Sequence, residues 1–143
     1  MTKPTFAAFA YDFTPRPDRP VIPKVFFSAL IYSTGRRGHV VENMFVVLYR
    51  GETRQTFSIW GYGDEKLARG CGLYVGETGV AYNHHFNPPE DSTGFNFKAG
   101  EYQLDVFAAP VGLEKPVHLT SVALHVPERD GVQVQEPECS YYT

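Results

Sequence analysis

Two adjacent histidines, His84 and His85, are followed by two acidic residues, Glu90 and Asp91. Imidazole nitrogens and carboxylate oxygens are both ligands for divalent metal ions. Successive side chains of a strand point to opposite faces, so one ion could take only one of the two imidazoles. His84 shares its face with apolar neighbours and is expected at the core, which leaves a weak site of His85, Glu90 and Asp91. A metal-dependent enzyme built on these three residues is the least favoured functional hypothesis.

Nucleophilic catalysis has little support in the sequence. The two cysteines, Cys71 and Cys139, form no CxxC motif, and we interpret them as unpaired thiols in a reducing compartment. No Gly-x-Ser-x-Gly motif and no phosphate-binding glycine loop occurs. His118 and His125 are seven residues apart in one predicted strand, so their side chains are expected on opposite faces. We therefore expect a protein without enzymatic activity and without a cofactor.

Three aromatic residues near flexible glycine loops, Trp60, Tyr62 and Tyr74, could instead bind a ligand. In the strand that ends at Trp60, alternation directs Phe57 and Ile59 inward and leaves Trp60 on the polar face. Exposed aromatic rings stack on sugar rings or anchor a protein interface. The sequence therefore offers a carbohydrate-binding module as one hypothesis. A tryptophan folded over the sheet edge as a lid is the structural alternative.

The composition is that of one folded domain spanning residues 1–143. Hydrophobic residues make up 43% of the chain and aromatic residues 15%, so a single core can form without disulfides or metal. The net charge of −3 and a pI near 5.9 argue against a nucleic-acid partner. No apolar run is long enough for a membrane helix. The first residues lack a secretory signal, so a complete chain is expected in the cytoplasm.

The 13 glycines and 11 prolines separate short segments rich in Val, Phe, Tyr, Ile and Thr. This pattern predicts an all-β fold, with one helical turn at residues 64–69. The predicted strands cover residues 5–12, 24–33, 40–49, 53–60, 72–75, 79–86, 94–97, 101–108 and 117–126, with an edge strand at 132–135. Such a set favours an antiparallel two-sheet β-sandwich, with a jelly roll as the main alternative.

The segment Ala99-Gly100-Glu101-Tyr102 precedes a cleanly alternating strand in which Tyr102, Leu104, Val106 and Ala108 share one face. It resembles the tyrosine corner of immunoglobulin-like and fibronectin-type sandwiches, where the phenol hydroxyl bonds to backbone a few residues upstream. The resemblance implies an immunoglobulin-like sandwich and no particular activity. It departs from antibody domains, because Leu104 stands where they have their second cysteine.

The predicted strands at residues 24–33 and 40–49 are apolar on both faces. Strands of a sheet with one solvent-exposed face would instead alternate apolar and polar residues. Expected as a hairpin, they would leave an outer apolar face that includes Phe26, Leu30, Tyr32 and Met44. Residues 13–23, 61–70 or 127–143 could cover that face within the chain. Alternatively it contacts another protein, most simply a second copy across a two-fold axis.

A non-catalytic protein-interaction or assembly module is therefore the leading hypothesis, with a homo-oligomer or another protein as partner. A glycan is the alternative partner, and neither nucleic acid nor membrane is expected. The predicted binding residues are Phe26, Leu30, Tyr32, Met44, Trp60, Tyr62 and Tyr74.

Overall fold

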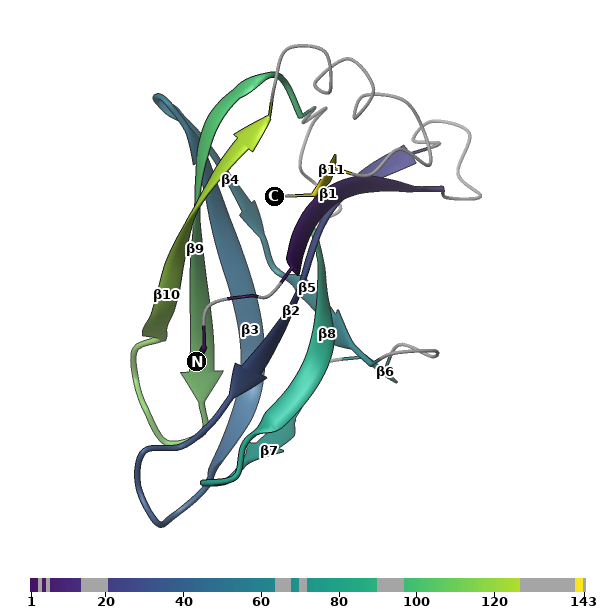
Figure 1. The fold of residues 1–143 in the computed structure, drawn as a ribbon. Helices are drawn as coiled ribbons and strands as arrows, with labels where there is room; N and C mark the ends of the chain where they lie inside the picture. Colours follow the sequence, from purple (N-terminus) through teal and green to yellow (C-terminus); the bar gives the residue numbers. More distant parts are fainter. Residues whose placement is uncertain are drawn as a thin grey trace.

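The computed structural model describes residues 1–2, 4, 6–13, 21–63, 68–69, 72–89, 97–126 and 141–142. These residues form two antiparallel β-sheets packed face to face, the predicted β-sandwich (Figure 1). The strands are β1 (Phe6–Phe13), β2 (Val21–Ile31), β3 (His39–Arg50), β4 (Thr53–Phe57), β5 (Ile59–Tyr62), β6 (Ala68–Arg69), β7 (Leu73–Val75), β8 (Val80–Asn87), β9 (Gly100–Pro110), β10 (Val117–Val126) and β11 (Tyr141–Tyr142).

The first sheet has the order β11-β1-β2-β8-β5-β6, and the second has the order β10-β9-β3-β4 with β7 beside β3. The helical turn predicted at residues 64–69 is wrong where the structure describes it, because Ala68–Arg69 pairs with β5 as β6. The strands predicted at 94–97 and 132–135 lie outside the described residues, apart from the buried Phe97.

The core lies between the two sheets and follows the predicted alternation over most of its length. From β2 it takes Val25, Phe27, Ala29 and Ile31, and from β9 it takes Tyr102, Leu104, Val106 and Ala108. These side chains alternate with more exposed residues that face outward. Removing this apolar surface from water is the main force that holds the sheets together.

Tyr102 makes the predicted contact with backbone upstream of its strand. Its hydroxyl accepts a hydrogen bond of 2.8 Å from the Lys98 amide and donates one to the Lys98 carbonyl. The ring is buried and meets Phe9 edge-on at 5.2 Å, while Phe9 stacks on Phe97 at 4.5 Å. The hydroxyl therefore fixes the entry of β9 while the ring joins the two sheets.

The prediction that Trp60 is exposed and Ile59 is buried is wrong. The chain leaves the second sheet after Phe57 and enters the first sheet at Ile59, with Ser58 between the two strands. This change of sheet reverses the alternation, so Phe57 and Trp60 both face the core, where Trp60 is 3% exposed. Ile59 faces outward and is 45% exposed.

The prediction that Met44 is on an outer face is also wrong, because it is fully buried in the core. A register shift between Val41 and Asn43 interrupts the pairing of β3 with β9. A bulge of this kind changes which residues face inward beyond it. Nor do β2 and β3 form a hairpin, because they belong to different sheets and residues 32–38 connect the two layers.

The outward apolar side chains of β3 are covered mainly by neighbours on the same sheet. Phe45 stacks on Phe107 at 5.0 Å, and the Arg54 guanidinium lies 5.9 Å from the centre of the Tyr49 ring. Val47, between these two groups, is only 3% exposed. The double-sided apolar pattern therefore needs no partner molecule along the middle of this strand.

Replacing Tyr102→Phe removes the two hydrogen bonds to Lys98 and keeps the buried ring. We expect the free energy of unfolding to fall by about 1–2 kcal/mol, because the partly buried amide and carbonyl of Lys98 lose their partner. Urea denaturation followed by tryptophan fluorescence measures the change. Tyr32→Phe, at a half-exposed tyrosine, is the control and should stay within about 0.5 kcal/mol of the parent protein. Equal losses in the two variants would contradict a structural role of the Tyr102 hydroxyl.

Candidate functional site at the apolar end of the sandwich

One end of the sandwich gathers most of the exposed apolar side chains. There β2 and β9 end, β3 and β10 begin, and β7 lies beside β3 (Figure 1, lower part of the view). Among the described residues seven large hydrophobic side chains are exposed, and Ile59 is the one that lies elsewhere. The other six define what we call the apolar end: Tyr32, Val40, Tyr74, Val111, Leu113 and Val117.

A pocket of about 310 Å³ opens at the apolar end. Its interior is formed by core side chains from both sheets, among them Ile31, Val41, Val75 and Ala108. At its rim are the exposed apolar side chains of Tyr32, Leu113 and Val117. A mostly apolar pocket with a few polar groups at its mouth is the usual form of a binding site.

The loops around this pocket are held by local hydrogen bonds. The hydroxyl of the buried Ser33 donates to the Arg37 carbonyl at 3.0 Å and accepts from the Gly35 amide at 3.3 Å. The Ser33 amide donates to the Gly76 carbonyl at 3.0 Å, which joins the 32–38 loop to the turn between β7 and β8. The rim is therefore an ordered surface.

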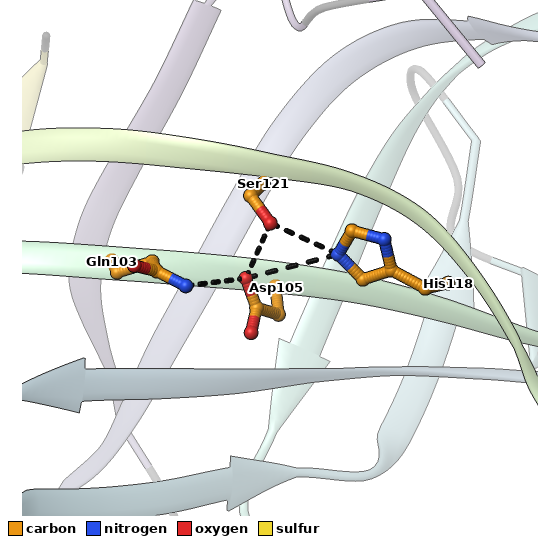
Figure 2. A network of polar contacts seen from close by, with 4 residues as sticks. All are labelled: Gln103, Asp105, His118 and Ser121. Atoms are coloured by element: carbon orange, nitrogen blue, oxygen red, sulfur yellow. Dashed lines mark hydrogen bonds and ion pairs between the residues drawn. The ribbon is translucent and has the colours of Figure 1, made fainter.

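His118 lies at the edge of the pocket and belongs to a polar network on the outer face of β9 and β10 (Figure 2). The Ser121 hydroxyl donates to the Asp105 carboxylate at 2.6 Å, and His118 Nε2 lies 2.9 Å from the same hydroxyl. Gln103 Nε2 donates to that carboxylate at 3.0 Å. The His118 ring also meets Phe107 edge-on at 5.3 Å. These contacts hold the imidazole at the pocket rim.

The network contains serine, histidine and aspartate, but it does not have the arrangement of a catalytic triad. In a triad the aspartate and the serine contact different ring nitrogens of the histidine. Here Nε2 lies near both Ser121 Oγ and, at 3.8 Å, Asp105 Oδ1. The Ser121 hydroxyl donates its hydrogen bond to Asp105, so it does not donate to the imidazole, as it would to a general base. The geometry positions His118 and does not activate Ser121.

The prediction that His118 and His125 face opposite sides of their strand is wrong. A register shift between His118 and Thr120 inserts one residue into β10. The imidazole of His125 consequently lies on the same outer face and contacts the Glu101 carboxylate. Both histidines are therefore surface groups beside carboxylates.

The remaining predicted binding residues are dispersed. Tyr32 and Tyr74 lie at the apolar end, whereas Phe26 and Leu30 are half-buried on the outer face of β2. Tyr62 packs against the core next to the buried Trp60, with ring centres 5.3 Å apart. Trp60, Tyr62 and Tyr74 therefore form no common platform for a sugar.

His85 is half-buried and stacks on Phe26 at 5.4 Å. Its proposed metal partners, Glu90 and Asp91, lie outside the described residues, as do Cys71 and Cys139. Within the described ranges no three residues of the types His, Cys, Asp and Glu are grouped closely enough to hold a metal ion. The same ranges contain no helix with the length and apolar character to span a membrane.

Sequence reasoning missed Val40, Val111, Leu113 and Val117. The segment Pro110-Val111-Gly112-Leu113 carried a usable signal, because two large apolar residues stand in a tight turn where polar residues are usual. The sequence carried no signal that Val40 and Val117 are exposed, since each belongs to a strand whose pattern also fits a buried face.

The buried His84 is the one strongly perturbed titratable group near the core in the described part of the chain. Its Nδ1 accepts a hydrogen bond of 3.1 Å from the Trp60 indole, which joins β8 to β5. Burial first, and the charge of the adjacent His85 second, lower the pKa of His84 from 6.5 to about 4. The imidazole is therefore neutral at pH 7, and its proton lies on Nε2, which has no hydrogen-bond partner among the described residues.

The stability of the protein should depend on pH through His84. The unfolded chain binds a proton at this residue near pH 6.5 and the folded chain only near pH 4, so stability is lost as the pH falls between these values. From that difference we expect a loss of about 3 kcal/mol by pH 4. Urea denaturation at pH 7, 5.5 and 4.5 measures it.

The variant His84→Phe isolates this effect. It should be less stable than the parent at pH 7 by about 1–3 kcal/mol, because the Trp60 indole loses its acceptor. The deficit should shrink as the pH falls towards 4, since the variant has no imidazole there to protonate. His39→Gln, at an exposed histidine, should keep the parent's pH dependence. A constant deficit across the range would contradict the assignment to His84.

Comparisons with models of protein families, with curated proteins and with solved structures find no match to this chain. The function therefore has to be inferred from the geometry of the molecule. Its most distinctive surface is the apolar end, with an ordered rim, a pocket and six exposed apolar side chains.

Proposed function

We propose that this protein is a non-catalytic assembly module that associates with a second copy of itself through the apolar end. The observation that carries the proposal is the grouping of six exposed apolar side chains at one end of the sandwich, three of which, Tyr32, Leu113 and Val117, line a pocket. Exposed apolar surface of this kind is characteristic of protein interfaces, since its burial is the main source of affinity. The proposal keeps the sequence-based hypothesis of an assembly module and moves its contact surface from the outer sheet faces to the end of the sandwich.

A second copy is the partner because this surface can complement itself. An interface across a two-fold axis brings the same surface together twice, so it needs both projections and hollows. Leu113 and Tyr74 are exposed at the apolar end, and Leu113 lies at the rim of the pocket. The surrounding loops carry exposed charges of both signs: Arg36, Arg37, Glu77, Glu114 and Lys115. Mixed charges can pair across the axis, whereas a surface of one sign would repel its copy.

We further propose an immunoglobulin-like topology for the sandwich, in preference to a jelly roll. The order β1-β2-β8-β5 corresponds to strands A, B, E and D, and the order β10-β9-β3-β4 corresponds to G, F and C with an added C′ strand. Tyr102 then lies near the start of strand F, the place of a tyrosine corner. This topology supports a binding role only by analogy, since the same fold carries many functions.

The self-association is tested with two matched variants, Leu113→Asp and Ile59→Asp. Both replace an exposed apolar residue, at 56% and 45% exposure, but only Leu113 belongs to the apolar end. We expect the parent chain and Ile59→Asp to approach the mass of a dimer as concentration rises. Leu113→Asp should associate at least about tenfold more weakly, because a carboxylate would be desolvated in the contact. Light scattering coupled to size exclusion measures the masses.

Circular dichroism of the two variants confirms that each remains folded. A parent chain that has the mass of one copy at every concentration up to about 1 mM would overturn the proposal. A larger effect of Ile59→Asp than of Leu113→Asp would move the interface to the outer face of the first sheet.

A further inference from the structure

At the apolar end, the side chain of Tyr74 packs against a segment of backbone that has no side chain. Tyr74 is the middle residue of β7, and its neighbours Leu73 and Val75 are buried in the core. Its main chain pairs with Val40 in β3. The alternation therefore directs the Tyr74 side chain outward, where it is 64% exposed.

Two glycines lie close to the phenol end of the Tyr74 side chain. A Cβ atom added to Gly38 would lie 2.3 Å from both Cζ and the hydroxyl oxygen of Tyr74, and 2.5 Å from Cε2. A Cβ atom added to Gly76 would lie 3.5 Å from the opposite side of the ring, at Cε1. The ring thus occupies space that exists only because residue 38 has no side chain.

Tyr74 has two exposed apolar residues beside it on neighbouring segments. Val40, its pairing partner, is exposed, and the Val40 carbonyl accepts a hydrogen bond of 2.9 Å from the Val111 amide. Val111 is 59% exposed. Three apolar side chains from three segments of the chain are therefore adjacent on the outer edge of the apolar end.

We propose that Tyr74, whose phenol end packs against Gly38, is the anchor residue of the self-association interface and stacks on an apolar surface of the second copy. The inference rests on the proposed function above. Interfaces derive most of their affinity from a few tyrosine, tryptophan or arginine side chains near their centre. A ring already held in its bound position loses little conformational freedom on binding. Gly38 is then a positioning residue, because it acts only through Tyr74.

The inference is tested with Gly38→Ala and its matched control Gly35→Ala. Both glycines lie in the 32–38 connection, neither requires a positive φ, and a Cβ atom at Gly35 would meet nothing within 4 Å. In Gly38→Ala the new methyl displaces the exposed end of the Tyr74 side chain, which moves at little cost to folding. We expect the dimer of Gly38→Ala to be at least about fivefold weaker and that of Gly35→Ala to stay within about twofold of the parent.

Two further variants separate the ring from its hydroxyl. Tyr74→Ala should weaken the dimer at least about tenfold, and Tyr74→Phe should stay within about threefold, because the ring supplies the contact. Sedimentation equilibrium gives the dissociation constants, and the thermal unfolding midpoints of the four variants should lie within about 3 °C of the parent. If Leu113→Asp weakens the dimer while Gly38→Ala and Tyr74→Ala do not, the role of Tyr74 is overturned and the assembly module remains. A monomeric parent chain overturns both.

Discussion

The passage of the chain from one sheet to the other at Ser58 is the constraint on which the rest of this sandwich depends. Because β4 ends the second sheet and β5 enters the first, Phe57 and Trp60 both point into the core. The Trp60 indole can then donate to His84, and this bond ties the crossing segment to β8. The crossing also ends β4 at Phe57 and leaves the first residues of β3 without β4 beside them. The short strand β7 pairs with β3 there, at His39, Val40 and Val41.

The apolar end follows from that arrangement. β7 is only three residues long, and two of its three side chains are used to cover the core between the sheets. The third, Tyr74, must point outward over the loop that carries Gly38. On the opposite side of β3, the connection from the end of β9 to the start of β10 carries Val111 and Leu113. Closing the sandwich with such short elements buries the core but leaves large apolar side chains at its margin.

Much of the architecture could be predicted from the sequence, because alternation over a continuous strand is a local property. It placed the inner faces of β2 and β9 correctly. The resemblance to a tyrosine corner added a contact of the Tyr102 hydroxyl with backbone a few residues upstream, which the structure places at Lys98. The errors share one physical cause. The side-chain period of a strand is two, so one inserted or skipped residue reverses every position beyond it. The bulge near Asn43 reversed the predicted face of Met44, and the bulge near Leu119 reversed that of His125. The crossing at Ser58 reversed that of Trp60.

The apolar end could not be predicted from side-chain alternation, and the cause is different from that of the errors above. Its residues come from strand termini and turns that are distant in sequence, and alternation does not say which termini meet. The apolar pattern of β3 was correctly recognised as unusual, but the sheet itself satisfies most of it through the Phe45 and Phe107 pair. The apolar side chain that remains exposed near the start of β3 is Val40, where β7 pairs with the strand. Tyr74 lies against that residue and is held on backbone that has no side chain. A ring restrained in this way gives up less entropy when it is buried in an interface, and this is the physical reason why we propose that the apolar end contacts a second copy.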